Sequence, residues 1–502
     1  MKQFVTKLKD RLRRPERWTG AATTALVIGI IIAINAVIYA LNMIFGLYIY
    51  KIEELDLTLS DAPAEVFADA MERGDEVTIL FCQPEEDVKV DMAGQYVYET
   101  ARRMAEAFPD FIHLEFENII IHPDRVEKYR NEEEGVYVAA GSVIFIHEDN
   151  YRVLTTLNSS VGYADFYTLD STNTVVAYNG EEVMTSMVLW VLEDEHKTAY
   201  FTVGHSETAD LTLTSLLNCA GYLVKTVDLR SQEVPSDAGL VIISNPIQDF
   251  ERAAAGSTVR AELSRLQSYM ERGGNVLAML DPYTVPKLGV LTSFLDTYGI
   301  SVATATNADG RTVPQLVHDG VQSISADGMS VVCDFGSGTV ASDMAETVRK
   351  NNDSRVLLSW AGALDLDASR GAEALLVASS SATTSASGEV TDREGGYALV
   401  GYGEKEYDGL TSRVIVVPSV YLSASEAMVS NGYANRDFLF ALMETVGVEQ
   451  TMPYGCKTAL LTATALENLT MGTARALTAL LLAIPAALAV VGTAVVLRRK
   501  YR

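Results

Sequence analysis

The sequence predicts an α/β protein whose folded part lies between two membrane-spanning helices. Three observations lead to this expectation. Two long uncharged segments lie near the ends of the chain, a mixed pattern of strands and a helix covers residues 55–195, and strands alternate with helices from residue 196 onward. With 502 residues the chain is too long for one compact core, so we expect more than one folded unit.

The two uncharged segments have the length of transmembrane helices. We assign them to residues 21–48, which contain no charged side chain, and 475–497, which contain none after Arg475. Each exceeds the roughly 20 residues that cross a bilayer as a helix. A cleaved signal peptide is the alternative for the first segment, but its apolar stretch is longer than the about 7–15 residues of a signal peptide.

Basic residues flank both segments on the terminal side. They crowd residues 1–20 and 498–502, so the positive-inside rule places both tails in the cytoplasm and the chain between the two helices outside the plasma membrane. The formal net charge is −27, and the exterior part is more acidic still, because the tails hold many of the basic residues. Such a charge argues against a nucleic-acid partner and against docking on anionic lipid.

Composition and motifs exclude several kinds of chemistry. The four cysteines are scattered without a CxxC spacing, so we expect neither a disulfide scaffold nor a zinc site. No GxxxxGK[ST] motif is present in the sequence, so ATP hydrolysis is expected from another chain. We therefore predict no metal and no cofactor.

The first exterior unit, residues 55–195, has the pattern of a thioredoxin-like fold. Predicted strands and one helix follow in the order strand, helix, strand, hairpin: 76–81, 93–108, 112–119, 142–148 and 151–157. The redox dithiol of such a fold is missing, because the loop after the first strand, "CQPEED", has only Cys82. We interpret the unit as a binding or packing module.

The second exterior unit, residues 196–448, is predicted to form a doubly wound, parallel sheet. Strands alternate with helices over 198–203, 208–221, 223–229, 239–244, 257–274 and 275–280. Later strands at 375–379, 397–403 and 413–419 are expected to complete or flank this sheet, before a last helix at about 434–447. We predict a polar loop at 379–389 and a tether at 449–474 that leads to the second membrane helix.

The segment "YFTVGHSE" (200–207) raises the question of a site. Three adjacent polar side chains cannot form a catalytic triad, because a triad is assembled from separate segments. In the structural interpretation Gly204 allows a sharp exit from the strand, Ser206 caps the next helix, and Glu207 lies near the helix N-terminus. However, ligands bind at the carboxyl ends of strands in doubly wound sheets. The candidate ligand-binding residues at such ends are Gly204, His205, Ser206, Glu207, Asn245 and Asp281.

Several longer segments resemble the GldG-like family, the auxiliary components of gliding-associated and related ABC transport systems. They are "YNGEEVMTSMVLWVLEDEHKTAYFTVGHSE", "LLNCAGYLVKTVDL", "VPSDAGLVIISNP", "LQSYMERGGNVLAMLDP" and "ANRDFLFALMETVG", and they occur in order over residues 70–448. The resemblance implies a thioredoxin-like domain followed by a class I glutamine-amidotransferase-like domain, held beside an ABC permease and its ATPase. This chain differs from some members in having a second membrane helix of its own and no fused permease domain.

An amidotransferase-like domain raises the question of a catalytic cysteine. An exposed nucleophile needs a strand-to-helix elbow, whereas Cys219 lies inside a predicted helix and Cys333 is not at the expected place in the sheet. We predict no catalytic residue and a non-enzymatic auxiliary subunit that binds a substrate or an exterior partner. The alternatives are a cell-envelope scaffold or sensor without an ABC partner, and an exterior amidase-like hydrolase.

Overall fold

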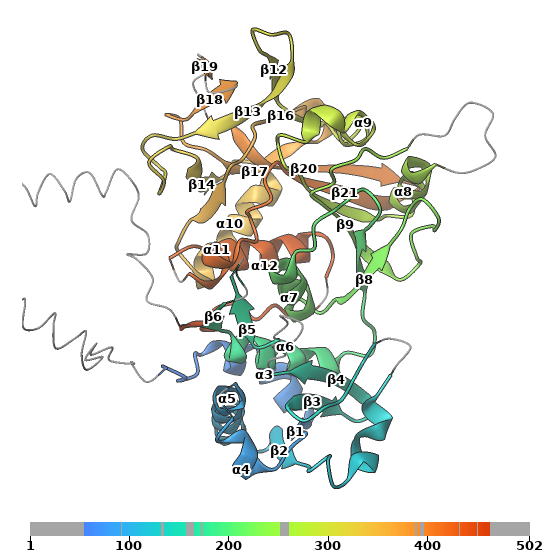
Figure 1. Cartoon of the computed structure of the whole chain (residues 1–502), viewed down its shortest axis with the longest axis vertical. Helices are drawn as coiled ribbons and strands as arrows, with labels where there is room; N and C mark the ends of the chain where they lie inside the picture. Colours follow the sequence, from blue (N-terminus) through green and yellow to red (C-terminus); the bar gives the residue numbers. More distant parts are fainter. Residues whose placement is uncertain are drawn as a thin grey trace, which may run out of the picture. The chain divides into compact units, whose positions relative to one another are not determined.

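A four-stranded and an eleven-stranded sheet organise the chain (Figure 1). The computed structural model describes residues 55–461 except 92, 132–134, 157–164, 171, 173, 252–260, 387–388, 392–395, 431 and 449. Both predicted transmembrane segments and both tails lie outside the described residues. Among the helices that are described, none has the length and apolar character needed to span a membrane.

The first region, residues 55–195, is built on the four-stranded sheet in the order β2-β1-β3-β4. β1 and β2 are parallel and the other pairs antiparallel, with α5 between β1 and β2 along the chain. The predicted order of strand, helix, strand and hairpin is therefore present. The bounds are α3 Ala62–Arg73, β1 Val77–Phe81, α4 Glu85–Val88, α5 Gly94–Ala107, β2 Ile112–Phe116, η1 Pro123–Tyr129, β3 Ser142–His147 and β4 Asn150–Thr155.

Helix α6 (Gly180–Leu192) connects the first region to the second. Its residues from Gly180 to Val191 are all buried, because it packs on α5, β3 and β4 on the one hand and on α7 on the other. A helix that is apolar around most of its surface is expected in such a position. By their contacts, the described residues from Leu57 onward form one compact unit.

A small third sheet joins the end of the described chain to the first region. It has the order β22-β6-β5, with β5 Tyr167–Leu169, β6 Val175–Tyr178 and β22 Ala459–Leu460. The segment predicted as a tether thus contains a strand, β22, which pairs antiparallel with β6.

The eleven-stranded sheet of the second region, residues 196–448, is mixed. β8, β7, β9, β10 and β21 are parallel neighbours, whereas β20, β17, β14 and β15 continue the sheet antiparallel. The prediction of a parallel sheet therefore holds for one half only. The direction changes at a two-residue hairpin between β20 and β21, where Asp408 and Gly409 both have positive φ (49° and 83°), as tight hairpins require.

The strands of this sheet include the three that were predicted to join it late in the chain. The bounds are β7 Thr198–Thr202, β8 Leu223–Val227, β9 Ala238–Ser244, β10 Asn275–Met279, β11 Ile300–Val302, β14 Ser330–Phe335, β15 Val356–Ser359, β16 Leu364–Leu366, β17 Glu373–Val377, β20 Ala398–Tyr407 and β21 Leu410–Val417. Every residue of β10 is buried, as expected for a parallel strand that is covered on both faces.

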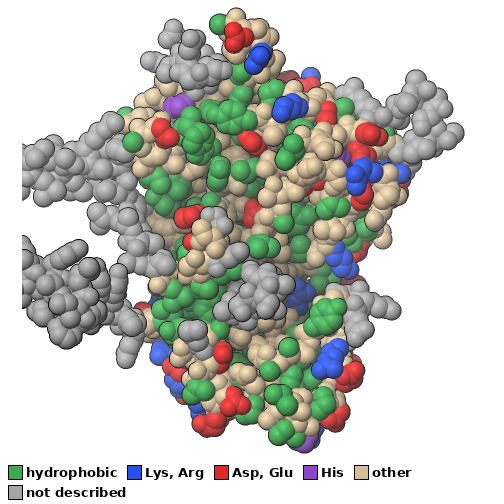
Figure 2. Space-filling view, in the orientation of Figure 1, with side chains coloured by type: hydrophobic (Ala, Val, Ile, Leu, Met, Phe, Trp, Pro, Cys, Tyr) green, Lys and Arg blue, Asp and Glu red, His purple; other side chains and the backbone are tan. Residues whose placement is uncertain are grey.

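Helices cover the two faces of this sheet. α8 and α9 contribute Leu266, Met270 and Leu291 to the core on one face, and α7, α10 and α12 lie on the other side in Figure 1. The bounds are α7 Leu211–Cys219, α8 Glu262–Met270, η2 Val285–Lys287, α9 Gly289–Asp296, α10 Thr339–Asn351, η3 Ala368–Arg370, α11 Ser425–Val429 and α12 Asn435–Thr445. Figure 2 shows acidic and basic side chains interspersed among hydrophobic and neutral ones on the same face of the molecule.

The polar segment 379–389 was predicted as a loop, and this is wrong for the part that forms strands. It contains β18 (Thr383–Ala386) and the start of β19 (Glu389–Thr391), which extend a sheet with the order β12-β13-β18-β19. β12 is Thr304–Thr306 and β13 is Thr312–His318. The small polar composition concealed the strand, but Ala382 and Thr384 alternate as buried residues, and threonine is favoured in strands.

Candidate functional site

Two polar clusters begin at the carboxyl ends of the neighbouring parallel strands β7 and β9. The first is reached through Gly204, which leaves β7 with φ of 116°. A Cβ atom at that position would lie 2.5 Å from Nε of Arg230, but that exposed side chain could move, so it is the backbone conformation that favours glycine. This agrees with the sharp exit predicted from the sequence.

His205 lies buried between two carboxylates, with 3% of its surface exposed. Its Nδ1 is 2.8 Å from Oε1 of Glu207, and its Nε2 is 3.1 Å from Oε2 of Glu262. The ring also stacks on Phe250 with the ring centroids 4.0 Å apart. We name Glu207, His205 and Glu262 the histidine cluster.

The electrostatics of the histidine cluster favour a charged imidazolium. Burial opposes the charge, but the hydrogen bonds and negative charges of Glu207 and Glu262 outweigh it and raise the pKa of His205. Burial also works against ionised Glu207, yet the hydrogen bond with His205 prevails and lowers the pKa of that carboxyl. A cation between two anions is the arrangement that a buried charge needs.

Backbone groups add to the histidine cluster, in which Oε1 of Glu262 is left without a hydrogen-bond partner among the described residues. Oε2 of Glu207 accepts the N–H of His205 at 2.6 Å, and Oε2 of Glu262 accepts the N–H of Glu251 at 2.6 Å. The carbonyl of His205 accepts the N–H groups of Ile247 and Gln248. The cluster thereby ties the loops after β7 and β9 to the start of α8, which is a structural role.

Ser206 does not cap the following helix, so that part of the prediction was wrong. Ser206 is exposed with φ of 60°, and α7 begins only at Leu211. The N-cap is Asp210, whose carboxylate accepts the N–H of Leu213 at 2.8 Å. Glu207 is bound to His205 rather than to the helix N-terminus, because the chain stays non-helical through residues 203–210.

The remaining two predicted residues lie at the ends of β9 and β10. Oδ1 of Asp281 accepts the N–H of Tyr283 at 2.9 Å, and its carbonyl accepts the N–H of Thr284, so it caps a turn. Asn245 has φ of 53°, and its Oδ1 has no hydrogen-bond partner within the described parts of the chain. Of the six predicted residues, Asn245 is the one that lines the cavity described next.

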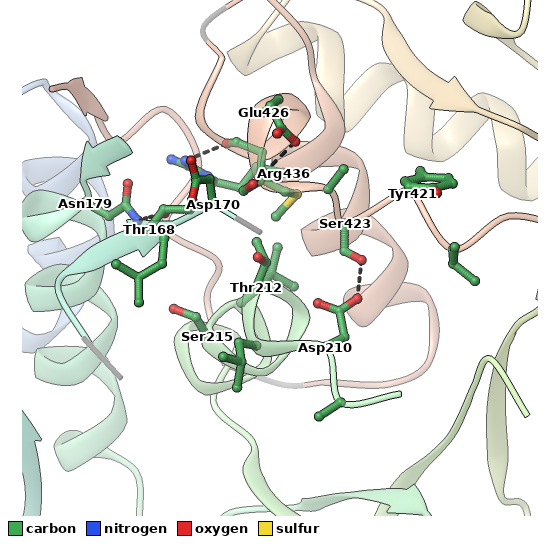
Figure 3. Close-up of a pocket in the computed structure, with 18 of the residues that line it drawn as sticks. Thr168, Asp170, Asn179, Asp210, Thr212, Ser215, Tyr421, Ser423, Glu426 and Arg436 are labelled. Atoms are coloured by element: carbon green, nitrogen blue, oxygen red, sulfur yellow. Dashed lines mark hydrogen bonds between the residues drawn. The ribbon is translucent and has the colours of Figure 1, made fainter. Parts of the chain in front are cut away.

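The second cluster surrounds a cavity of about 490 Å³, shown in Figure 3. We name it the junction cavity, because its walls come from both regions: β5 and the start of α6 on one side, and the start of α7, the end of β9, the segment 420–428 and α12 on the other. Its volume is in the range of small-molecule sites. In Figure 3, Asn179 and Thr168 stand on one side, Asp210 and Ser423 on the other, and Thr212 and Ser215 between them.

Asp210 forms one wall of the junction cavity. Besides capping α7, its Oδ2 accepts the hydroxyl of Ser423. This carboxylate accepts hydrogen bonds from neutral groups, among them the Leu213 N–H and the Ser423 O–H. Burial raises the pKa of Asp210 against the effect of these hydrogen bonds.

An ion pair between the two regions forms the opposite wall. Nη1 of Arg436 lies 2.9 Å from Oε2 of Glu182, with side chains 13% and 8% exposed. Burial raises the pKa of Glu182, and the guanidinium opposes that shift. Arg436 also donates to the carbonyl of Met428 at 2.7 Å, so its donors are largely engaged.

The side chain of Asn179 contains a hydrogen-bond acceptor that no donor among the described residues satisfies. It is 7% exposed, and its Nδ2 donates to Oγ1 of Thr168 at 2.6 Å. Its Oδ1 is left without a hydrogen-bond partner among the described residues. A buried polar atom of this kind costs free energy unless something fills its place.

Sequence reasoning missed most of the junction cavity. Its lining comes from four separate segments, at about 165–182, 208–216, 244–245 and 420–436. No local pattern links them, although Arg436 lies in the segment "ANRDFLFALMETVG" that carries part of the family resemblance.

The cysteines are poorly suited to nucleophilic chemistry. Cys82, Cys219 and Cys333 are buried, and burial raises the pKa of Cys82 to about 12. Burial also raises the pKa of Cys219 and of Cys333. Thiols in such surroundings stay protonated and inert. Within the described residues, no group of three or more His, Cys, Asp or Glu side chains could hold a metal ion.

Comparison with known proteins gives only distant likenesses. No protein-family model matches the sequence, and no curated protein matches it. Among solved structures, the N-terminal domain of mmIFT52 has 14% identity and a TM-score of 0.37, over 50% of this chain and 97% of that one. A putative ThuA-like protein from Parabacteroides merdae has 13% identity and a TM-score of 0.29, over 53% and 98%. PurLQS from Thermotoga maritima has 11% identity and a TM-score of 0.27, over 50% and 100%. These values are too low to assign a family, a ligand or an activity.

Proposed function

We propose that the chain is a non-enzymatic, membrane-anchored auxiliary subunit of an ABC transport complex, of the GldG-like kind. Its exterior part binds a ligand in the junction cavity, while the helices at 21–48 and 475–497 hold it beside a permease. The partner ATPase supplies the energy. The observation that carries the proposal is the junction cavity itself, whose polar lining comes from both regions.

Two features of the fold support the family assignment within this proposal. The order of strand, helix, strand and hairpin in the first region is that of a thioredoxin-like unit. The parallel strands β8, β7, β9, β10 and β21 with helices on both faces suit a class I glutamine-amidotransferase-like domain. The buried, protonated thiols favour a binding role for such a domain over thiol catalysis.

The position of the cavity suggests how binding is transmitted. A ligand in the junction cavity touches residues of both regions at once, so it stabilises the arrangement in which both walls contact it. A ligand shifts an equilibrium only by its difference in affinity for the two states. The Glu182–Arg436 ion pair, which spans the two regions beside the cavity, is the contact most directly affected.

The test is purification of the tagged full-length protein in mild detergent, with identification of the co-purifying chains by mass spectrometry. We expect an ABC ATPase together with a polytopic permease. A matched control replaces residues 21–48 by an unrelated membrane span of equal length, which keeps the anchor but removes the native packing surface and should lose the permease. Recovery of neither partner, under conditions that keep a known membrane complex intact, would contradict the proposal and favour an envelope scaffold or sensor.

A further inference from the structure

We propose that the junction cavity, together with a row of exposed side chains beside it, binds an uncharged oligosaccharide. The inference rests on the proposed function in one respect, namely that the exterior part binds a ligand at the junction cavity. It adds the chemical class of that ligand and a second part of its binding surface.

The row lies where four neighbouring parallel strands end. One large apolar or aromatic side chain follows each of the strands β7, β9, β10 and β21, and the four are between 46% and 55% exposed. The carboxyl ends of parallel neighbours meet at one edge of a sheet, where ligands bind in open α/β folds. Three strand spacings make the row about 14 Å long, which suits a short chain of sugars better than one ring. The four side chains are Leu211, Ile247, Tyr283 and Tyr421.

Hydrogen bonds join the loops that carry these side chains. The N–H of Leu280 donates to the last carbonyl of β21 at 2.9 Å, so the chain after β10 and the chain after β21 leave the sheet together. The N–H of Asn245 donates to the last carbonyl of β10 at 2.8 Å, and that of Ile247 to the carbonyl of His205 at 2.9 Å. The loop after β9 is thereby tied to its neighbours on both sides, and the row has a fixed base.

Trp360 adds a further ring beside the segment after β21. It is 42% exposed and has φ of 54°, a backbone conformation that is rare for a bulky side chain. The carbonyl of Ser359 accepts the hydroxyl of Ser419 at 2.6 Å. The N–H of Gly362 donates to the carbonyl of Pro418 at 2.8 Å. These bonds fix the loop of Trp360 against the segment after β21. Strained residues of this kind cluster at ligand sites.

Two members of the row also line the junction cavity. Leu211 and Tyr421 belong to its wall, so the row and the cavity form one continuous surface. Seven of the residues in that wall are serine or threonine, and Figure 3 shows Thr212 and Ser215 between the two sides of the cavity. A sugar ring has faces of C–H groups and a rim of hydroxyls that donate and accept. Aromatic rings next to hydroxyls and carboxylates therefore match it on both counts.

The charges of the lining argue against an anionic ligand. Of the described residues that line the cavity, Arg436 is the only cationic side chain, and it is paired with Glu182. The carboxylates of Asp210 and Glu426 also line the cavity and would repel a phosphate or a sugar acid. A carboxylate accepts hydrogen bonds from neutral hydroxyls, as Asp210 does from Ser423. The hydroxyls of an uncharged sugar are donors of the same kind.

Two other uncharged ligands fit less well. An extended peptide binds by adding a strand along a sheet edge, whereas the row runs across the ends of the strands. An acyl chain needs an enclosed apolar site. The row is about half exposed, and the cavity beside it is lined by carboxylates and hydroxyls that an acyl chain would leave without partners.

The first experiment is isothermal titration calorimetry of the full-length protein in a detergent without a sugar head group. The probes are maltotetraose, cellotetraose, mannotetraose and N-acetylated chitotetraose, each beside its monosaccharide, and tetragalacturonic acid as the acidic probe of equal length. We expect at least one uncharged tetrasaccharide to bind at least about tenfold more tightly than its monosaccharide, because one ring covers only part of the row. The acidic probe should bind at least about tenfold more weakly than that tetrasaccharide.

Variants tie the binding to the row and to the cavity. Tyr283→Ala and Tyr421→Ala should each weaken it about threefold to tenfold, whereas Tyr283→Phe keeps the ring and should retain it. Thr212→Val should cost about twofold to tenfold, the value of one hydrogen bond. Tyr283 is 55% exposed, so its variants should fold normally even if Thr212→Val does not. The matched control is Tyr137→Ala, which truncates an exposed tyrosine of the first region and should leave the affinity unchanged.

Four results would overturn the inference: no binding of any uncharged tetrasaccharide, equal binding of tetrasaccharide and monosaccharide, equal binding of the acidic probe, or an equal loss with Tyr137→Ala and Tyr283→Ala. The pull-down separates this failure from that of the proposed function. If the ATPase and permease are recovered but no tetrasaccharide binds, the ligand class is wrong and the transport role stands. If a tetrasaccharide binds but neither partner is recovered, the transport role is wrong and the ligand class stands.

Discussion

The histidine cluster and the junction cavity lie at the ends of the same two strands but differ in how their polar groups are paired. Both begin at the carboxyl ends of β7 and β9, where polar side chains collect. In the histidine cluster the imidazole lies between two carboxylates and is 3% exposed, and Oε1 of Glu262 has no hydrogen-bond partner among the described residues. In the junction cavity the carboxylates outnumber the cations and two amide oxygens lack donors. The strand ends bring polar groups together in both places. The local balance of charge decides whether these groups pair with one another in a closed cluster or line an open cavity.

The largest effect is expected when the histidine cluster loses the imidazole of His205. His205→Leu leaves Glu207 and Glu262 buried and uncompensated, which should cost about 3–5 kcal/mol of unfolding free energy. The measurement is the midpoint of chemical unfolding of the full-length protein. Asp281→Asn is the matched control at the end of β10, because asparagine can cap the same turn, and it should cost less than about 0.5 kcal/mol. A loss below about 1 kcal/mol for His205→Leu would mean that the cluster is not a buried ionic unit.

The wall of the junction cavity contains the ion pair between Arg436 and Glu182. Arg436→Leu should cost about 3 kcal/mol, because Glu182 stays buried without its partner. The double variant Glu182→Leu with Arg436→Leu should recover most of this loss, since it removes both charges together. Unfolding midpoints of the two single variants and the double variant test the coupling. Additive losses would show that the ion pair does not stabilise the junction.

A smaller effect is expected from pH, because a change of protonation removes only part of the stabilisation that the histidine cluster gives. The raised pKa of His205 gives stability that is complete below its usual value of 6.5 and is lost as pH rises through the folded-state pKa. The lowered pKa of Glu207 gives stability that is complete above its usual value of 4.5 and is lost as pH falls through the folded-state pKa. The difference in melting temperature between wild type and His205→Gln should therefore be largest between about pH 4.5 and 6.5. A difference that does not change with pH would contradict the assignment.

The smallest effect is expected at the rim of the cavity. Ser423→Ala removes the hydroxyl that donates to Asp210 and should cost about 1 kcal/mol, the net value of one hydrogen bond. The same variant should raise the pKa of Asp210 further, because that hydrogen bond favours the ionised form. Unfolding midpoints at neutral pH and about pH 4 report both changes. The matched control is a Ser215→Ala variant, which removes another hydroxyl that lines the cavity, from α7.

Local sequence was sufficient for most strands and helices and for the backbone at single positions. The apolar run of β10, the strand–helix–strand–hairpin order of the first region and the positive φ of Gly204 all follow from a few neighbouring residues. The hydropathy of residues 21–48 and 475–497 predicts two membrane helices on the same local basis. Errors arose where a local signal was ambiguous, as with Ser206 and Asp210, which are both good caps within five residues.

The site depended on the tertiary structure. Glu262 meets His205 only because α8 packs beside the ends of β7 and β9, and Arg436 meets Glu182 only because α12 lies against the start of α6. The junction cavity likewise needs four distant segments. Propensity and periodicity are set within a turn of helix or a few residues of strand, so the sequence by itself determined the elements and the polar strand ends. Ion pairing and cavity shape depend on which elements pack together, so only the tertiary structure decided which polar groups are neutralised and which remain open to a ligand.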